Sequence, residues 1–393
     1  MSPVTTQAVP KWTLVVLVMS ARPHFVQRRL IRETWANTTA FKTDRRMPNA
    51  TFPERTGGTT LSVPTVKVLF VVGMPRDSVD DGLHSQRLQR EQVAHHDLVL
   101  VPVADVYSNL IYKLVCALDD ISSSEYNSTS FVMKVDDDTY LDLPPLLFDL
   151  VHPRHPRKLH LQGQIWKSPP IRNSSHKNWV SEAYYPMDSH LPYAHGAHYL
   201  LSKDVVDFIV RNERYLNPSI IPHEHRGNLE DVRISTWAFA IGCKMVHDTR
   251  FVESYNCHSQ AISLSDVPHH LFKHIRDTIS KRNGSGMCAW PLHEFAVSVF
   301  QRRAVSGSQS LFAQATAHNN AGAHFVMLGS LRKAYEEFLL AHTKDQTRTW
   351  SNLQYFDEHP DELDCAYDSA CGRKLRRSTD VGLQLFAHAL AEP

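Results

Sequence analysis

The chain has 393 residues, and its 42 lysines and arginines against 41 aspartates and glutamates give a formal net charge of +1. Because proteins that bind nucleic acid or acidic lipid usually carry a basic excess, this balance argues against a general binder of either kind. Hydrophobic residues at 42% and charged residues at 21% are ordinary values for a globular protein and argue against a disordered chain. The length suits one α/β domain of about 250 residues with an appendage, or two to three smaller domains.

Signals for the cellular compartment point in two directions. The apolar run at 12–19 is far shorter than the roughly 18 residues that a membrane helix needs, so it predicts a buried strand, and neither signal peptide nor anchor is visible. Five glycosylation sequons exceed the number expected by chance and indicate a secretory compartment; they begin at Asn37, Asn49, Asn127, Asn173 and Asn283. The six cysteines are compatible with disulfides there, with free buried thiols as an equal alternative. Their pairing is left open, although Cys365 and Cys371 are close enough in sequence to close a small loop.

Short apolar runs alternate with helical patterns along most of the chain. Strands buried on both faces are expected at 12–19, 66–72, 97–103 and 131–135. Amphipathic helices are expected after the first strand, from Val26 to Trp35, and along the apolar stripe from Tyr107 to Leu118. A further helix is expected over 230–241, ended by Gly242 at a position that helix C-caps favour. This alternation predicts an α/β fold with a mostly parallel, doubly wound sheet flanked by helices, and such sheets bind ligands at the carboxyl ends of their strands.

Composition also indicates the loops and the domains. Residues 37–64, 167–192 and 213–229 are expected to be loops. Strand-like runs fade after about 290 and helical patterns such as 331–340 take over. We therefore expect a domain at 11–290 and a helical C-terminal extension at 291–393, whose role the sequence does not indicate.

An acidic triplet, Asp136-Asp137-Asp138, follows the strand at 131–135. If strand geometry persists, Asp136 and Asp138 point to one side and Asp137 to the other. Two converging carboxylates repel each other unless a cation or hydrogen-bond donors compensate, and Mn²⁺ or Mg²⁺ suits such oxygen ligands. The alternative is an acidic turn that caps the next helix.

Other acidic motifs are excluded by position. An EF-hand starting at Asp136 needs Asp or Asn, Gly and Glu at three later positions, which here hold Tyr140, Leu141 and Leu147. A phosphatase-type Asp-x-Asp-x-Thr pattern also meets Tyr140. The sequence contains no phosphate-binding loop of the Walker type and no zinc-type cysteine spacing.

Six motifs in the same order resemble the β-1,3-glycosyltransferases, glycosyltransferase family 31, across about 11–257. They are RRLIRETW at 28–35, FVVG at 70–73, DVYSNL at 105–110 with Lys113, VMKVDDD at 132–138, YAHGAHYLLS at 193–202 and EDV at 230–232. Each motif alone is weak, but their order is specific. Within the family, LPY at 191–193 and HDTRF at 247–251, followed by Cys257, most resemble the β-1,3-galactosyltransferase branch that builds the proteoglycan linker.

The resemblance implies a nucleotide-diphospho-sugar fold of the GT-A type and an inverting, metal-dependent transfer from a UDP-sugar. The favoured reaction moves galactose from UDP-galactose to the 3-hydroxyl of a sugar acceptor on a glycan or glycoprotein, forming a β-1,3 linkage. A UDP-N-acetylglucosamine transferase and a non-catalytic sugar-binding relative are the alternatives. Family members are usually type II membrane proteins of the Golgi, so a Golgi lumenal location and membrane association are expected although no anchor is visible.

The resemblance also implies the roles of the acidic residues. Asp231 is expected to be the general base, and Glu230 to orient hydroxyl groups or to be the second candidate for the base. Asp138 and Asp136 are expected to hold Mn²⁺, with Mg²⁺ as the alternative, and Asp136 to contact the ribose or a metal-bound water. An Asp or Glu in the first turn of a helix is also favoured by the helix dipole alone.

Donor contacts complete the predicted site. The UDP-sugar is expected to be bound by Arg32, Lys113, Lys134, Asp136, Asp137 and Gly196. For Arg32 and Lys113 the alternative is a solvated helix position, whereas the missing Cβ of Gly196 would let the backbone approach the sugar. Trp35 and Trp237 are expected in the core.

The histidine ligand of the metal is left unassigned. Many enzymes of this fold supply a histidine after the EDV helix, but 262–266 contains none. The nearby histidines are His247, His258 and His269.

Overall fold

The computed structural model describes residues 12–37, 64–176, 178–216, 229–281, 286–288, 290–305, 310–328 and 330–344. The chain divides into two compact units, Met1–Val252 with Ala261–Lys273 and Glu253–Gln260 with His274–Pro393. Most of the predicted loops at 37–64 and 213–229, the sequons at Asn49 and Asn283, and the predicted loop between Cys365 and Cys371 lie outside the described residues.

The first unit is built on a seven-stranded sheet, counted over the described residues, in the order β3-β2-β1-β4-β7-β6-β8. The strands are β1 (Leu14–Met19), β2 (Val66–Met74), β3 (Leu98–Ala104), β4 (Phe131–Asp136), β6 (His160–Trp166), β7 (Tyr193–Ser202) and β8 (Lys244–His247). All neighbours pair in parallel except β7, which is antiparallel to both β4 and β6. The mostly parallel α/β sheet predicted from the sequence is confirmed.

The strand order creates a crevice at one edge of this sheet. From β1 the chain first adds β2 and β3 on one side, and β4 then pairs with the other side of β1. The order therefore reverses between β1 and β4, and open α/β sheets bind ligands outside the carboxyl ends of the strands at such a switch point. Because β7 runs antiparallel, its first residues reach the same edge at which β4 and β6 end.

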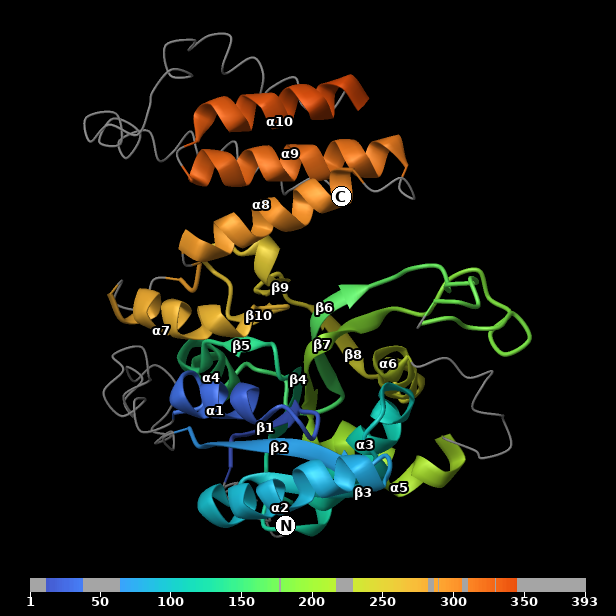
Figure 1. Ribbon diagram of the computed structural model, residues 1–393. Helices are drawn as coiled ribbons and strands as arrows, with labels where there is room; N and C mark the ends of the chain where they lie inside the picture. The colour runs from blue at the N-terminus through green and yellow to red at the C-terminus, as the bar shows by residue number, and fades with distance from the viewer. Residues whose placement is uncertain are drawn as a thin grey trace. The chain divides into compact units, whose positions relative to one another are not determined.

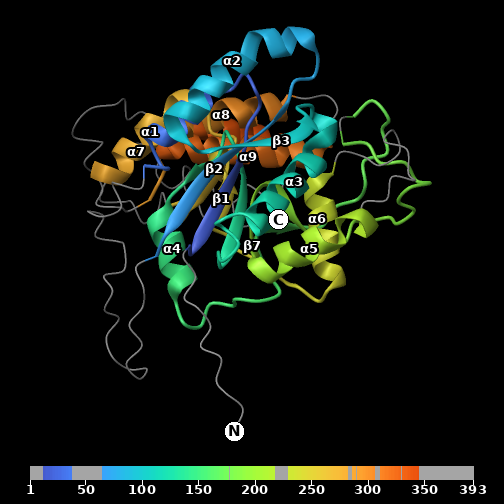
Figure 2. The same cartoon turned by 90° about the horizontal axis from the view of Figure 1, so that it is seen from below.

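Helices cover both faces of the sheet (Figures 1 and 2). On one face, α3 (Leu110–Ser123), α5 (Lys203–Leu216) and α6 (Glu230–Ala240) share one buried apolar cluster with alternate residues of the strands. On the other lie α1 (Phe25–Glu33) and α4 (Leu143–Val151), and α2 (Ser78–His95) is joined to α1 by ion pairs. Strands covered on both sides need apolar residues at every position, which explains why LVVLVM in β1 is wholly buried.

Several helices and loops lie close to where the sequence pattern predicts them. The apolar stripe at 107–118 forms a 3₁₀ turn, η2 (Tyr107–Asn109), followed by α3. The helix expected over 230–241 is α6, and Gly242 follows with a φ of +76°, the left-handed conformation of a helix C-cap. The loop predicted at 213–229 begins later than expected, because residues 213–216 still belong to α5. Residues 167–192 run as a loop with one isolated bridge between Ile171 and Trp179, leaving out position 177 (Figure 1).

A small sheet, β5-β10-β9, supports the turn after β4. Its strands are β5 (Tyr140–Leu141), β10 (Ser263–Ser265) and β9 (Phe251–Glu253). Directly after β10, the Val267 amide donates to the Asp138 carbonyl at 2.9 Å. The acidic triplet is thereby tied to a segment more than a hundred residues away.

The second unit is helical where it is described, with α8 (Trp290–Ala304), α9 (Leu311–Met327) and α10 (Leu331–Lys344); α7 (Phe272–Lys281) spans the division. Gly322 lets α9 and α10 approach closely, because a Cβ there would lie 2.6 Å from Phe338 Cε1. Cys257 and Cys288 form a disulfide within this unit, one of the pairings that the sequence left open. Among the described cysteines, Cys116 and Cys243 are not disulfide-bonded. In the described parts of the chain, every helix is too short or too polar to cross a bilayer.

Candidate active site

The acidic triplet lies at the carboxyl edge of the sheet, at the switch point between β1 and β4. Asp136 is the last residue of β4, and a turn follows in which the Thr139 amide donates to the Asp136 carbonyl at 3.1 Å. Asp136 points toward α6 and Asp137 toward α1, as the alternation of a strand predicts. Asp138 belongs to the turn rather than to the strand.

The ammonium of Lys134 links three parts of the site. It donates to Asp136 Oδ1 at 2.6 Å and to the Gly196 carbonyl, and lies 3.5 Å from Glu230 Oε2. Burial alone would lower the pKa of Lys134, but Asp136 and Glu230 outweigh it and the pKa is raised. This buried cation therefore fixes the end of β4 against β7 and the start of α6.

Glu230 is fully engaged by buried partners. The Tyr199 hydroxyl donates to Glu230 Oε1, while Lys134 approaches the other oxygen. Only 3% of Glu230 is exposed, and burial raises its pKa to about 7, against the opposing effect of Lys134. These contacts give Glu230 a positioning role rather than an open position beside a substrate.

Asp231 occupies the first turn of α6 and faces β7. Its Oδ1 accepts a hydrogen bond from the Val232 amide at 2.8 Å, so one oxygen makes the helix-terminal contact that the dipole interpretation predicts. The other oxygen faces Gly196, where an added Cβ would lie 3.0 Å from Oδ2. The missing Cβ of Gly196 thus makes room for the Asp231 carboxylate. Burial raises the pKa of Asp231.

On the α1 side, Asp137 and Lys113 order the turn after β1. Asp137 accepts from the Ser20 hydroxyl at 2.7 Å and lies 2.8 Å from His24 Nδ1. This hydrogen bond raises the pKa of His24. Lys113 Nζ donates to the Ser20 carbonyl and to Asp105 Oδ1, both at 2.7 Å, and burial lowers its pKa. Lys113 is buried, so the solvated-helix alternative is wrong for this residue.

Asp138 lies among other carboxylates. Burial, followed by the charges of Asp136, Asp266 and Asp137, raises the pKa of Asp138 to about 7. Asp266 ends the stretch 262–266, in which the expected histidine ligand is missing. Its backbone is left-handed, with a φ of +52°. His269 is the candidate histidine that comes nearest to the triplet, with Nε2 3.3 Å from the Asp137 carbonyl. In the described part of the chain, no three histidine, cysteine or acidic side chains converge on a metal position.

Arg32 is held in an ion-pair network away from the triplet. Its Nε and Nη2 donate to the two oxygens of Asp97, each at 2.8 Å, and its Nη1 lies 2.8 Å from Glu91 Oε1. The guanidinium also stacks over Phe70. All three guanidinium nitrogens thus meet carboxylates, which argues against the solvated-helix alternative, and a contact of Arg32 with the nucleotide stays a prediction.

Other expected residues lie elsewhere. His247 ends β8, where its Nδ1 accepts from the Ile165 amide at 3.0 Å. Trp35 and Trp237 are 4% and 7% exposed, so their assignment to the core is confirmed. His258 belongs to the second unit.

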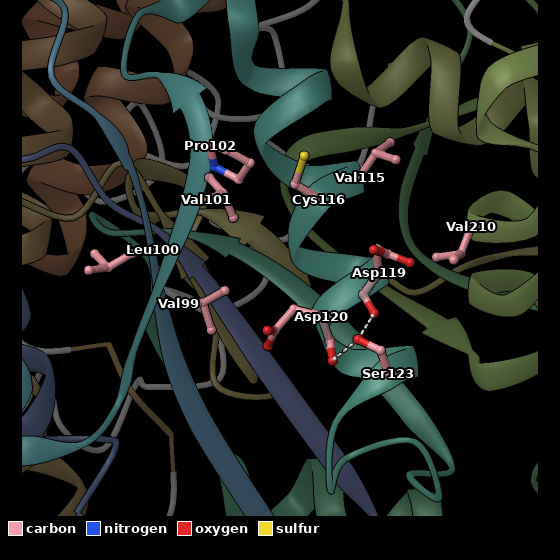
Figure 3. A pocket seen from close by; sticks show the side chains of 10 residues that line it. All are labelled: Val99, Leu100, Val101, Pro102, Val115, Cys116, Asp119, Asp120, Ser123 and Val210. Carbon is pink, nitrogen blue, oxygen red and sulfur yellow. Dashed lines mark hydrogen bonds between the residues drawn. The ribbon is translucent and has the colours of Figure 1, made fainter.

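Two pockets in the first unit lie apart from the acidic triplet. One of about 430 Å³ lies between β3 and α3, with Asp119, Asp120 and Ser123 on its helical side (Figure 3). The Ser123 hydroxyl donates to the backbone carbonyls of Asp119 and Asp120 in the last turn of α3. These contacts give Ser123 a structural role in the helix rather than a catalytic one. The other, of about 500 Å³, is lined by residues of α4, β6 and β8 and their flanking turns, including His160 and Lys244. Neither pocket is lined by the predicted catalytic residues.

Sequence reasoning missed the residues that support the acidic groups. Tyr199 and Asp266 were not singled out, and Ser20 and His24 lie before the first family motif. Knowledge of how β4 pairs with β7 would have pointed to Tyr199, because Lys134 and Tyr199 lie directly opposite each other in that antiparallel pair. That pairing joins segments 65 residues apart and is not readable from local patterns.

The comparisons with known proteins decide the family. A family model described as "Galactosyltransferase" matches residues 26–249, more than half of the chain. The chain belongs to the galactosyltransferase family. This confirms the resemblance to the β-1,3-glycosyltransferases, and the match includes the triplet and α6.

Curated relatives of this galactosyltransferase chain carry names with two donor sugars. Beta-1,3-galactosyltransferase 6 of Mus musculus is 32% identical over 63% of this chain and 67% of its own length. Lactosylceramide 1,3-N-acetyl-beta-D-glucosaminyltransferase B of Danio rerio is 31% identical over 52% of this chain and 50% of its own length. Beta-1,3-galactosyltransferase 1 of Homo sapiens is 24% identical over 61% of this chain and 63% of its own length. The matches therefore span between half and about two thirds of these relatives.

Proposed function

We propose that this chain is an inverting hexosyltransferase that moves galactose from UDP-galactose to the 3-hydroxyl of a sugar acceptor and forms a β-1,3 linkage. The observation that carries the proposal is the convergence of Asp231, Lys134 and the acidic triplet at one sheet edge. The buried ammonium of Lys134 there contacts Asp136, which belongs to the proposed metal site, and Glu230, the residue next to the proposed base. The family and the names of the relatives support the reaction type.

Inversion in one displacement requires a base on the face of the sugar opposite the leaving group. This base takes the proton of the acceptor hydroxyl as the new bond to C1 forms. Asp231 suits this role because one of its oxygens is fixed by the Val232 amide and the other faces Gly196. Glu230 suits it less well, because Tyr199 and Lys134 engage both of its oxygens.

The carboxylates after β4 fit a hard divalent cation. Asp138 is half-buried beside Asp136 and Asp266, an arrangement that repels negative charge until a cation neutralises it. Mn²⁺ or Mg²⁺ is commonly held by one or two carboxylates together with substrate phosphates, so a complete protein cage is not required. Asp138 and Asp136 would hold the ion, which would neutralise charge on the departing diphosphate. Lys134 keeps Asp136 oriented, and Asp137 keeps the turn joined to Ser20 and His24.

UDP-N-acetylglucosamine is the alternative donor, because one relative carries that sugar in its name at nearly the same identity as the first. A non-catalytic relative is disfavoured, since the triplet and Asp231 are both present. The acceptor would belong to a glycan or glycoprotein, in the Golgi lumen and with the membrane association usual for the family. Asn37, Asn127 and Asn173 themselves are exposed, which is compatible with a secretory location.

UDP release tests the proposal directly. The purified chain is incubated with UDP-galactose, UDP-N-acetylglucosamine or UDP-glucose, with Mn²⁺ or EDTA, and with xyloside, galactoside or N-acetylglucosaminide acceptors. Release from UDP-galactose that is stimulated by an acceptor and abolished by EDTA is the expected result. Release only from UDP-N-acetylglucosamine would support the alternative donor, whereas silence together with no Mn²⁺-dependent UDP binding would favour the non-catalytic relative.

A further inference from the structure

Trp166 is a large aromatic side chain that stays exposed at the carboxyl edge of the sheet. It is the last residue of β6 and pairs in register with Tyr193, the first residue of β7. Of its surface, 37% is exposed, whereas Trp35 and Trp237 are almost wholly buried. Tryptophan combines a large apolar face with a polar N–H and is enriched at binding interfaces.

The indole is held in place by His195. The two ring centroids are 4.4 Å apart and the planes are inclined by 31°. On its other side His195 meets His198 edge-on, with the centroids 5.8 Å apart. Over the described residues, His195 Nδ1 is buried without a hydrogen-bond partner. Ring contacts with Trp166 and His198, rather than a hydrogen bond at Nδ1, therefore orient this imidazole.

The same strand carries the indole's partner and the glycine that faces the base. His195 immediately precedes Gly196, whose missing Cβ leaves room for Asp231 Oδ2. The charge of His195 also acts on Asp231, where it opposes the effect of burial on the pKa. The His195 imidazole is therefore within electrostatic range of the carboxylate to which an acceptor hydroxyl would give its proton, and Trp166 stacks on that imidazole.

We propose that Trp166, backed by His195, is the surface on which the acceptor sugar ring rests while its hydroxyl faces Asp231. This inference rests on the proposed function and adds the contact that selects the acceptor. A pyranose ring presents C–H groups on its faces and hydroxyl groups around its rim, so it can lie flat on an indole while its hydroxyls remain available. A preoriented ring costs little entropy on binding, because the indole has few rotamers and His195 already restricts them.

The test compares Trp166→Ala with Trp166→Phe. Methyl glycosides of galactose, xylose and N-acetylglucosamine are the acceptors, because an aryl glycoside would stack through its own ring. Removing a central aromatic anchor costs about 2 kcal/mol or more, so the acceptor KM of Trp166→Ala should rise about thirtyfold. The KM for the UDP-sugar should stay within about twofold in that variant. Trp166→Phe should recover most of the acceptor affinity, because it keeps a flat apolar face.

Leu100→Ala is the matched control, since Leu100 is 56% exposed on the distant edge strand β3. It should leave both KM values unchanged. An unchanged acceptor KM in Trp166→Ala, or an equal rise in the KM of the UDP-sugar, would overturn the proposal.

Saturation-transfer NMR separates this proposal from the proposed function. If the unmodified chain transfers no sugar, the same methyl glycosides are tested for binding in the presence of UDP and Mn²⁺. Binding that Trp166→Ala abolishes and Trp166→Phe retains would support the ring contact even without catalysis. Binding that is equal in all variants, or absent from the unmodified chain, would refute it.

Discussion

The carboxylates of the site differ in function because they differ in the side chains that contact them. Glu230 and Asp231 are adjacent in sequence, yet Glu230 lies between Tyr199 and Lys134 whereas Asp231 faces Gly196. Burial raises the pKa of both groups. Adjacent residues at a helix start point in different directions, and this divergence separates the positioning residue from the candidate base.

Asp231→Asn tests the base. The amide keeps the shape of the side chain but cannot accept a proton, so transfer should fall by about 10²- to 10⁴-fold. UDP binding should be unchanged, which calorimetry with Mn²⁺ checks. In the unmodified chain, kcat/KM should fall as the pH is lowered, because the base must be deprotonated. Since the pKa of Asp231 is raised, this fall should occur at a higher pH than for an ordinary aspartate. Near-normal turnover of the variant would move the base to Glu230.

Asp138→Ala tests the metal site. Removal of a carboxylate ligand should weaken Mn²⁺-dependent UDP binding by about a hundredfold or more. Even the loss of a residue that only hydrogen-bonds to a metal ligand typically lowers metal affinity by about 10- to 100-fold. Calorimetric titration of UDP with and without Mn²⁺ measures this loss. The control is Asp119→Ala, at an exposed carboxylate on α3, which should bind UDP with the same Mn²⁺ dependence as the unmodified chain. Equal Mn²⁺-dependent affinity in both variants would exclude Asp138 as a ligand.

At the scale of the elements, the RRLIRETW motif joins β1, α1 and α2. Arg28 is wholly buried and donates to Glu91 at 2.8 Å and to the Ala21 carbonyl at 2.7 Å. Ile31 and Trp35 fill the core beside it. Burial would raise the pKa of Glu91, but Arg28 and Arg32 together lower it. A sequence motif of the family therefore serves to hold α1 and α2 over the sheet.

Arg28→Met should destabilise the first unit by about 3 kcal/mol, because it leaves the Glu91 carboxylate, whose side chain is only 9% exposed, with Arg32 as its remaining cation. Breaking a buried ion pair costs about 3–5 kcal/mol. The neighbouring Arg29 is a matched control, since its side chain is 65% exposed. Arg29→Met should change stability by no more than about 0.5 kcal/mol. Urea unfolding followed by tryptophan fluorescence compares the two variants, and equal midpoints would refute the structural role of Arg28.

The elements also show what local patterns can and cannot predict. The β1, β2, β3 and β4 strands were found because short, mostly apolar runs that alternate with helical patterns are typical of buried strands in an α/β chain. The 18-residue helix α2 was missed, because Leu88 is its one buried side chain and an amphipathic stripe is lacking. The triplet was found from its position after a buried strand, and Asp231 followed from the family motifs. Tyr199, the partner of Glu230, and Asp266, the neighbour of Asp138, are brought there by strand pairings distant in sequence, which a single sequence does not reveal.

At the scale of the whole chain, two units with different interiors are joined. The sheet unit buries aliphatic strands together with His160, His190 and His198, and the helices of the second unit also bury several histidines. His293 Nδ1 lies 3.0 Å from His324 Nδ1, and His318 Nδ1 lies 2.7 Å from Glu337 Oε2. Burial, followed by the charge of His293, lowers the pKa of His324 to about 3. Protonation of such buried neutral histidines in acid should cost folding stability.

The histidine pair predicts that the second unit loses stability in mild acid. An unfolded histidine has a pKa of about 6.5, so below that pH the unfolded chain binds a proton that folded His324 rejects. Stability should therefore fall as the pH drops from 6.5 toward 3, by about 2 kcal/mol at pH 5. Hydrogen exchange of the α9 and α10 amides at pH 7.5 and 5.0, corrected for intrinsic rates, measures the loss. His324→Phe should flatten this dependence, whereas His274→Phe, at an exposed histidine, should leave it unchanged. Equal loss of protection in both variants would mean that other groups cause the acid sensitivity.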